Sequence, residues 1–344
     1  MYHMLYMKIA YIAPYEGEKE IALSLLSEYE VVFVDAPIRD EVPELIRDAE
    51  VLSVFVDSKI SETMVDSMPN LTHIVLRSTG FDHVPVAYAQ AKGIAVSYVP
   101  HYGSQTVAEF AFALILALSR KAYAAYDTLR TTGEVYIKKF EGFDLKGKTL
   151  GVVGTGAIGR HICEIADGFG MHVVAFDMFP DEDFATKQGI TYIPFIDLLA
   201  QSDIVTLHIP SSAANKHLLN ETSLHQMKHG SYLINTSRGD LVDTVALTKA
   251  IKEGPLAGAG LDVYEGEQFI RDEMELLTEE RHFDEHTWKA FAAEHELLDM
   301  EQVIVTPHVA FNSSEAKREI TETTVQNIEA VLAGTPQNLV KLAS

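Results

Sequence analysis

The chain has 344 residues, of which 47% are hydrophobic and 22% are charged, and it carries a net charge of −23. This apolar content excludes a disordered acidic chain, and the length favours two domains, each large enough for its own core. The excess of 50 acidic over 27 basic residues argues against a nucleic-acid partner, because phosphate contacts require clustered positive charge. The single cysteine, Cys163, cannot form an internal disulfide, and we interpret it as a core residue.

Neither a targeting segment nor a membrane span is evident. The N-terminal stretch lacks a positively charged region followed by an apolar run and a cleavage site. The longest apolar run, from Phe110 to Leu118, is far shorter than the ~20 residues that span a bilayer. We therefore expect a soluble protein of the cytoplasm without a membrane partner.

The first part of the chain alternates strand-like and helix-like segments. Short runs rich in β-branched residues predict the strands, and the stretches between them predict helices. Strands are predicted at 7–13, 31–36, 51–56, 71–78 and 94–99, with helices at 17–28, 41–49, 61–67 and 84–91. This alternation is typical of a parallel sheet with crossover helices.

A long helix and a second series of strands come next. Residues 104–131 contain no proline and no internal glycine, so they predict one helix, with an apolar middle that is buried on both sides. Such a helix is a natural crossover between domains and a candidate subunit contact. Strands are then predicted at 149–154, 172–177, 191–193, 203–209, 231–236, 257–263 and 303–307, before a last helix at 313–333.

A glycine motif joins the first strand of the second series to a helix. Gly154, Gly156 and Gly159 form G-x-G-x-x-G, which permits a tight turn, a close approach to a pyrophosphate and close packing of helix on strand. The start of the helix supplies N–H donors for the phosphates. Asp177 ends the next strand, where a carboxylate binds the ribose hydroxyls of NAD and repels the 2′-phosphate of NADP. The motif therefore predicts an NAD site.

Three polar side chains follow strands of the same series. Arg238, Glu267 and His308 each come shortly after a predicted strand, and the carboxyl ends of parallel strands form the ligand-binding edge of such sheets. We expect them to converge beside the cofactor. There Arg238 would bind a carboxylate and polarise a carbonyl, His308 would transfer a proton, and Glu267 would keep the histidine charged and oriented.

Over nearly its whole length the chain resembles the D-isomer-specific 2-hydroxyacid dehydrogenases, and within them the lactate dehydrogenase branch. The resemblance rests on RSTGFDHV (77–84), GVVGTGAIG (151–159), NTSRGDLVDTVAL (235–247), LDVYEGE (261–267) and VTPHVAF (305–311). It implies that Arg238, Glu267 and His308 are the catalytic triad.

The resemblance also implies binding roles for other residues. The N–H groups of Ala157 and Ile158 would contact the pyrophosphate, and Asp177 would bind the adenosine ribose. The rest of the nucleotide site would be lined by Ile209, Pro210, Asn215, Thr236, Ser237, Arg238 and Asp262. The substrate would meet the backbone N–H groups of Thr79 and Gly80, together with Tyr102, Arg238 and His308.

A discontinuous domain arrangement follows from the same resemblance. A flavodoxin-like substrate domain would comprise residues 1–103 and 313–344, and a Rossmann NAD-binding domain would comprise residues 104–312. Both would be doubly wound α/β domains, with hinges near 101–104 and 310–314. A homodimer is the expected assembly.

One block departs from the family pattern. Glu267 and His308 lie farther apart in the sequence than in typical relatives, and the extra length coincides with an acidic stretch at about 268–302, for which we expect helices. The stretch contains H-x-x-E-H at 282–286, a pattern also found in metalloproteases. It lies within a complete dinucleotide-binding pattern and lacks an evident further ligand, so we expect no metal site.

The sequence thus predicts an NAD-dependent oxidoreductase that interconverts a short 2-oxoacid and its D-2-hydroxy acid. A dinucleotide-sensing binding protein or corepressor on the same fold is one alternative. A phosphoglycerate- or hydroxypyruvate-type dehydrogenase is another. The aromatic candidates for the pocket, Phe55, Tyr102 and Phe311, favour an apolar substrate side chain, whereas Lys59 and Arg77 leave a phosphate open.

Overall fold

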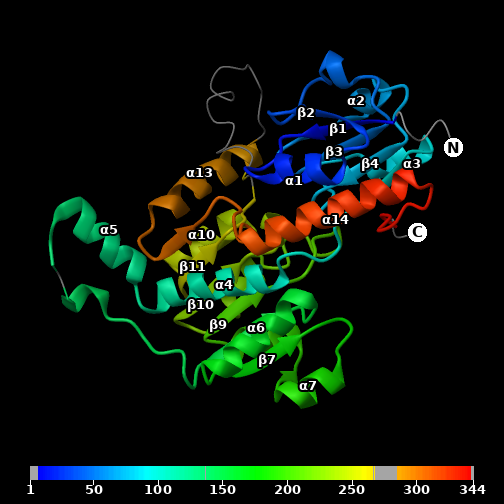
Figure 1. Ribbon diagram of the computed structural model, residues 1–344. Helices are drawn as coiled ribbons and strands as arrows, with labels where there is room; N and C mark the ends of the chain where they lie inside the picture. Colours follow the sequence, from blue (N-terminus) through cyan, green and yellow to red (C-terminus); the bar gives the residue numbers. More distant parts are fainter. Residues whose placement is uncertain (1–6, 136, 266, 268–284, 342–344) are drawn as a thin grey trace. The chain divides into compact units, whose positions relative to one another are not determined.

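The computed structural model describes residues 7–135, 137–265, 267 and 285–341. The chain divides into two compact units, Met1–Gly103 with Asn312–Ser344, and Ser104–Phe311. Each unit is built on its own parallel sheet (Figure 1). The expected α/β fold class is confirmed, whereas the assignment of substrate and nucleotide to the two units stays a prediction.

The first unit contains a five-stranded sheet in the order β2-β1-β3-β4-β5 within the described residues. Its elements are β1 (Lys8–Ile12), α1 (Glu18–Leu25), β2 (Glu30–Val34), η2 (Glu44–Ile46), β3 (Val51–Val54), α2 (Glu62–Asp66), β4 (His73–Leu76), α3 (Val86–Ala91), β5 (Ala95–Ser97) and α14 (Ser314–Leu332). Helices α1 and α14 pack together on one face, where Ile328 joins Ile9 in a buried cluster. The C-terminal helix thereby completes a unit begun by the N-terminal strands.

The second unit contains a seven-stranded sheet in the order β12-β11-β10-β9-β6-β7-β8 within the described residues. Its elements are α4 (Ser104–Ser119), α5 (Ala122–Thr132), η3 (Ile137–Phe140), β6 (Thr149–Val153), α6 (Ala157–Gly168), β7 (His172–Phe176), α7 (Glu182–Gln188), β8 (Thr191–Tyr192), α8 (Phe195–Gln201), β9 (Ile204–Leu207), α9 (Glu221–His225), β10 (Ser231–Asn235), η4 (Gly239–Leu241), α10 (Thr244–Lys252), β11 (Leu256–Leu261), α13 (Glu285–Asp299) and β12 (Val303–Val305). The strand order reverses between β6 and β9, which is where doubly wound sheets bind ligands.

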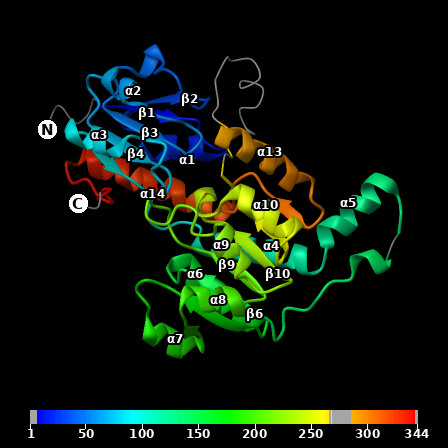
Figure 2. The ribbon, with the colours of Figure 1, turned by 180° about the vertical axis from the view of Figure 1, so that it is seen from behind.

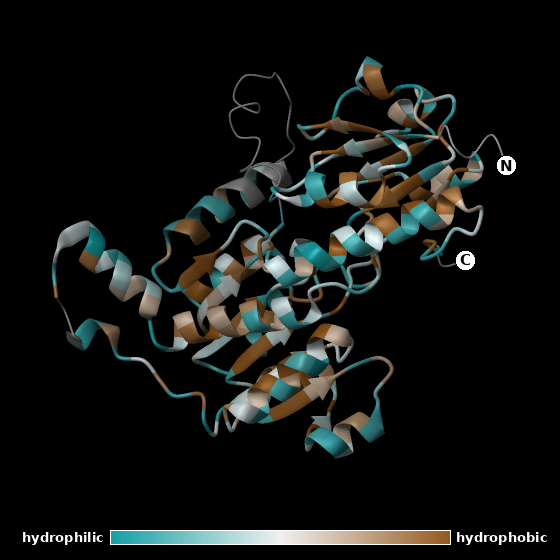
Figure 3. Cartoon of the chain, viewed as in Figure 1, coloured by the Kyte–Doolittle hydropathy of each residue, from teal (hydrophilic) through white to brown (hydrophobic). Residues whose placement is uncertain are grey.

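Helices cover both faces of this second sheet. α4 and α6 pack on one face (Figure 1), and α8, α9 and α10 lie on the other (Figure 2). The central strands β6 and β9 are mostly apolar and buried, as expected for a sheet covered on both faces, whereas the edge strand β8 is more polar (Figure 3). Cys163 is buried in the α4–α6 layer, and burial raises the pKa of its thiol to about 12. This agrees with the structural role inferred for it.

Two predicted helices are wrong in extent. The helix expected at 104–131 is two helices, because Lys121 adopts a left-handed conformation with φ of 50°. The Ser119 carbonyl, at the end of α4, accepts a hydrogen bond from the Phe143 amide. That carbonyl is therefore held by a distant segment where the first helix stops. The helix expected at 41–49 is only the short η2, which begins directly after Pro43.

The acidic block is described only in part. Residues 268–284 lie outside the described residues, and with them most of the H-x-x-E-H stretch. The later part of the block forms α13, which packs against α10 and β12. Across the described ranges, no helix has both the length and the apolar character needed to cross a membrane.

Candidate active site and dinucleotide site

The turn after β6 has the geometry that the glycine motif predicts. Gly154 has a φ of +94°, and a Cβ there would lie 2.6 Å from the His208 carbonyl oxygen. A Cβ on Gly159 would clash with the Gly154 carbonyl, so this glycine lets α6 pack onto its own turn. Gly156, which precedes α6, faces open space instead. A ligand can therefore approach the backbone there.

The first turn of α6 begins at Ala157 and Ile158. Its opening N–H groups have no partner within the helix, as at every helix start, and they form a favourable site for an anion. The opposite side of the helix is anchored by Ile162, Cys163 and Ala166, which are buried. The pyrophosphate contacts predicted for Ala157 and Ile158 are thus placed on a rigid element.

Asp177 follows β7 and is held by three hydrogen bonds. One carboxylate oxygen accepts from the Thr155 amide at 2.7 Å and the Thr155 hydroxyl at 3.0 Å, and the other accepts from the Phe179 amide at 2.9 Å. Burial alone would raise the pKa of Asp177, but these bonds lower it below its usual value. The carboxylate is therefore a fixed negative charge beside the glycine turn.

The loop after β9 packs against the segment after β10. The Ser237 hydroxyl donates to the Ile209 carbonyl, which ties the two segments together. The Asn215 amide is used inside its own loop, where it bonds Ser212 and the Pro210 carbonyl. Asn215 therefore shapes the loop in this structure, and its predicted contact with a nucleotide stays a prediction.

Two buried groups at this edge are notable. The Thr236 hydroxyl is buried, and no described group bonds it. It is an unsatisfied polar atom at the place where the nicotinamide end of NAD is expected. His208 is partly buried beside Gly154, and burial of its ring lowers the pKa of the imidazole to about 3, so it is neutral. The free hydroxyl, the open Gly156 and the start of α6 all fit a bound dinucleotide.

Asp262 organises the segment that carries His308. It is fully buried, and its oxygens accept hydrogen bonds from the Thr306 hydroxyl and from the amides of Val309 and Ala310. His308, between them, adopts a left-handed conformation with φ of 55°. A residue keeps such a conformation when its surroundings hold it firmly. The carboxylate predicted to bind the nicotinamide end is thus committed to the backbone around His308.

Glu267 and His308 form a direct pair. The Glu267 carboxylate oxygen Oε1 lies 3.3 Å from His308 Nδ1, and both side chains are partly buried. The contact with Glu267 uses Nδ1 and not Nε2 of the ring. Arg238 directly precedes η4, and its Nη1 donates to the Ser237 carbonyl at 2.8 Å. All three residues belong to the second unit, on segments that follow β10, β11 and β12.

The remaining predicted residues belong to the first unit. Thr79 and Gly80 follow β4, and the Thr79 hydroxyl is bonded to the Val99 carbonyl at 2.9 Å. Tyr102 is half-buried near the end of the unit's first segment. Arg77 is fully buried, with Nη2 bonded to the carbonyls of Ile12 and Ala13. Its guanidinium serves the core, which removes it as a surface site for a substrate phosphate.

Sequence reasoning missed several polar residues that shape these sites. Thr155 lies inside the glycine motif, and its pairing with Asp177 was open to prediction from that position. His217 and Glu265 form a second histidine–carboxylate pair, which the sequence separation of 48 residues hides. No set of three or more His, Cys, Asp or Glu side chains able to hold a metal occurs among the described residues.

Comparisons with known proteins agree with this architecture. A family model described as D-isomer specific 2-hydroxyacid dehydrogenase, NAD binding domain, matches residues 112–310. The chain is 33% identical to D-lactate dehydrogenase of Escherichia coli over 310 residues, which cover 89% of this chain and 90% of that protein. It is 34% identical to glyoxylate reductase of Thermococcus litoralis over 313 residues, covering 89% and 87%. The crystal structure of D-lactate dehydrogenase from Aquifex aeolicus complexed with NAD and lactic acid superposes with a TM-score of 0.84 at 32% identity, covering 98% and 100%.

Proposed function

Because the chain belongs to the D-isomer-specific 2-hydroxyacid dehydrogenase family, we propose that Arg238, Glu267 and His308 carry out its reaction on a short 2-oxoacid. The chain is an NAD-dependent oxidoreductase, so the predicted enzyme class and cofactor are confirmed. The contact between Glu267 and His308 supports the proposed roles, because it joins the two residues expected to manage the proton.

Each of the three side chains has a chemical task in this proposal. Bound NADH supplies the hydride that reduces the carbonyl carbon. His308 donates a proton from Nε2 to the carbonyl oxygen, and Glu267 at Nδ1 stabilises the imidazolium that must exist before transfer. Arg238 binds the substrate carboxylate and carbonyl oxygen through its planar guanidinium, a geometry that lysine cannot reproduce. In the oxidative direction, neutral His308 accepts the proton.

The nucleotide is assigned to the switch point of the second sheet. Ala157 and Ile158 would bind the pyrophosphate, Asp177 the adenosine ribose, and Thr236 the nicotinamide end. The fixed charge on Asp177 supports NAD over NADP, and the unsatisfied Thr236 hydroxyl supports a polar ligand group beside it. Thr79 and Gly80 would present their backbone N–H groups to the substrate carboxylate.

The substrate is proposed to be short, with an apolar side chain. Phe55 is buried and Tyr102 is half-buried in the first unit, and Phe311 lies edge-on to His308 in the second, with ring centroids 6.5 Å apart. The burial of Arg77 weakens the phosphoglycerate-type alternative. Relatives include proteins named D-lactate dehydrogenase and glyoxylate reductase, and both names refer to a small 2-hydroxy acid or 2-oxoacid.

A panel of oxoacids tests this proposal. Oxidation of NADH would be followed with pyruvate, 2-oxobutyrate, 2-oxoisocaproate, glyoxylate, hydroxypyruvate and oxaloacetate, and the chirality of each product determined. We expect turnover of pyruvate and 2-oxobutyrate to the D-hydroxy acids. A steep preference for oxaloacetate or for a phosphorylated hydroxypyruvate would contradict the proposed apolar side chain of the substrate, and absence of turnover with every oxoacid would support a dinucleotide-sensing protein.

A second copy of the chain is proposed to cover α5. This helix has 11 residues and no buried one, and it extends away from the sheet of its own unit (Figures 1 and 2). It exposes Tyr123, Tyr126 and Leu129, each by more than half. An isolated helix of this length is marginal in water. Its two charged side chains, Asp127 and Arg130, pair with each other, so the helix itself brings no net charge to such a contact. Location in the cytoplasm also stays a prediction.

A further inference from the structure

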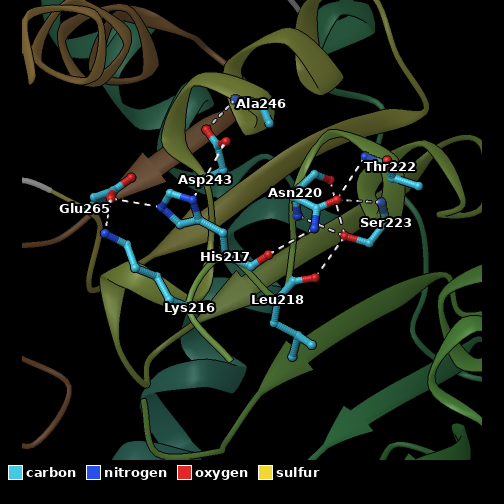
Figure 4. Close-up of polar contacts among 9 residues, drawn as sticks. All are labelled: Lys216, His217, Leu218, Asn220, Thr222, Ser223, Asp243, Ala246 and Glu265. Atoms are coloured by element: carbon cyan, nitrogen blue, oxygen red, sulfur yellow. Dashed lines mark hydrogen bonds and ion pairs between the residues drawn. The ribbon is translucent and has the colours of Figure 1, made fainter. Parts of the chain in front are cut away.

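A second histidine–carboxylate pair lies in the same unit as the proposed catalytic residues. His217 Nε2 donates to Glu265 Oε1 at 2.9 Å, as Figure 4 shows. The two side chains are only 23% and 17% exposed, so water competes weakly for this bond. Glu265 is two residues from Glu267. The pair therefore acts on the segment that carries the proposed partner of His308.

The backbone around His217 is held firmly to the segment after Arg238. His217 has a φ of 52°, a left-handed conformation that needs support. Its amide donates to the Asp240 carbonyl at 2.8 Å, and Leu219 forms an isolated parallel bridge with Val242. The imidazole of His217 thus projects from a fixed loop.

The backbone before Glu267 packs on that same segment. A Cβ on Gly239 would clash with the carbonyl group of Tyr264, so the backbones of these two segments are in contact and leave no space for a side chain. The Glu267 amide lies 3.4 Å from the Tyr264 carbonyl oxygen, a long hydrogen bond that closes a turn. The hydrogen bond from His217 to Glu265, at 2.9 Å, is shorter than this backbone bond and should hold the turn more firmly.

Other charges face the pair and balance it. Lys216 Nζ lies 3.7 Å from Glu265 Oε1, and Asp243 Oδ2 lies 4.0 Å from His217 Nδ1 (Figure 4). Glu294 of α13 interacts electrostatically with Glu265, and its pKa, raised to about 8, keeps it protonated near neutral pH. Lys216 therefore brings a positive charge to the Glu265 carboxylate. Asp243 is mainly occupied at the start of α10, where it accepts from the Ala246 amide.

We propose that His217 and Glu265 are positioning residues that hold Glu267 against His308. The inference rests on the proposed function, because it assumes that Glu267 stabilises the imidazolium of His308. When the hydrogen bond between His217 and Glu265 is removed, the turn that carries Glu267 is held less firmly. His308 is then paired with Glu267 for a smaller fraction of the time. Glu267 then stabilises the imidazolium of His308 less, so we expect reduction to decline at a lower pH than in the parent.

Variants at both positions test this role. His217→Asn removes the imidazole but keeps a residue that tolerates the left-handed conformation. His217→Gln restores a longer amide donor, and Glu265→Ala removes the acceptor. Glu265→Gln is the milder change, since it retains an acceptor if Glu265→Ala folds poorly. Reduction of a 2-oxoacid by NADH would be measured across pH, with kcat and KM separated and thermal unfolding recorded for each protein.

Matched controls separate position from general damage. His161 on α6 pairs with Glu164 at 3.1 Å, and this pair is more exposed than that of His217 and Glu265, so His161→Phe removes a histidine–carboxylate pair elsewhere. Lys216→Ala removes the half-exposed ammonium that faces the same carboxylate. Glu267→Gln reports the effect of losing the partner of His308 itself.

The expected result is a shift of the alkaline limb to lower pH in His217→Asn and Glu265→Ala, in the direction that Glu267→Gln shows. We expect kcat to fall about tenfold, as for loss of a coupling of ~1.4 kcal/mol, with KM for NADH within about twofold. The kcat of the double variant should be no lower than that of either single variant, because the two substitutions remove the same hydrogen bond. His217→Gln should recover part of the loss.

The outcomes separate the two ideas. If Glu267→Gln moves the alkaline limb while His217→Asn and Glu265→Ala leave it in place, the positioning role is wrong and the proposed function stands. If the losses of kcat in the two single variants add up in the double variant, the two residues do not act through one shared hydrogen bond, and the positioning role is wrong as well. If Glu267→Gln itself leaves the profile unchanged, the proposed role of Glu267 fails, and the positioning role fails with it.

Discussion

The Glu267 carboxylate lies 3.3 Å from Nδ1 of His308. At this position it could both orient the imidazole ring and stabilise its positive charge, and substitution of Glu267 separates these two effects. In Glu267→Gln the amide can still orient the ring but cannot stabilise its positive charge. We expect the alkaline limb of the reduction profile to move to lower pH, with a modest loss at the new optimum. His308→Gln should lose activity at every pH. A Glu267→Gln profile that superposes on that of the parent would exclude the proposed role.

Arg238 tests the substrate contact separately. Arg238→Lys keeps a positive charge but loses the planar pair of donors that binds a carboxylate and a carbonyl together. We expect KM for the oxoacid to rise and kcat to fall, with the pH limbs in place because the proton belongs to His308. Steady-state kinetics with pyruvate would measure this. A pure rise in KM would show that Arg238 binds the ground state alone.

Asp177 should set the choice between the two dinucleotides. Its carboxylate is fixed by Thr155 and the Phe179 amide, and its lowered pKa keeps it anionic. A 2′-phosphate beside it is a like-charge contact that costs several kcal/mol in a partly buried site. We expect kcat/KM for NADH to exceed that for NADPH at least ~100-fold, and Asp177→Ala to narrow the ratio. Equal values in the parent would refute the assignment.

At the scale of elements, α13 contains a buried acid. Glu294 is only 2% exposed, and no described group bonds its carboxyl oxygens. Leu261, Tyr264, Leu297, Leu298 and Val305 line the pocket around it. Burial, together with repulsion from Glu265, raises the pKa of Glu294 to about 8. The folded protein therefore holds this proton at pH values where the unfolded chain, with an ordinary pKa near ~4.3, has lost it.

The sign of the stability effect follows from that difference. The stabilising contribution of the bound proton is complete below about pH 4.3 and is lost as pH rises to about 8, by at most ~1.4 kcal/mol per unit. Glu294→Gln removes the ionisation, so we expect it to raise Tm at pH 8 far more than at pH 5. Scanning calorimetry at both pH values measures this. Glu296→Gln, an exposed position on the same helix, is the control, and an equal change at both pH values would contradict the assignment.

At the scale of the whole molecule, the exposed apolar side of α5 predicts assembly. Tyr126→Glu combined with Leu129→Glu places charges where we expect the second copy, while both residues stay on an exposed helix. Sedimentation should show a dimer for the parent and a monomer for this variant. Leu45→Glu, at an equally exposed position in the first unit, should leave the dimer intact. A monomeric parent would overturn the proposed assembly.

The sequence by itself determined the features that depend on local pattern. Alternating strands and helices predicted two parallel sheets, because periodicity and β-branched composition act over short stretches. The glycine spacing predicted the turn before α6, where Gly154 takes a positive φ. The position of Glu267 and His308 after their strands predicted that they converge, because parallel strands share one carboxyl edge.

Only the tertiary structure decided the contacts between distant segments. Asp262 bonds the Thr306 hydroxyl before His308 and two backbone amides after it, His217 bonds Glu265, and Glu294 is buried near Glu265. The break at Lys121 accompanies a bond from Phe143 to the end of α4, which no local pattern of residues 104–131 contains. Such pairings follow from how whole elements pack, and packing is a property of all the surfaces that meet. A residue's neighbours in sequence do not contain that information.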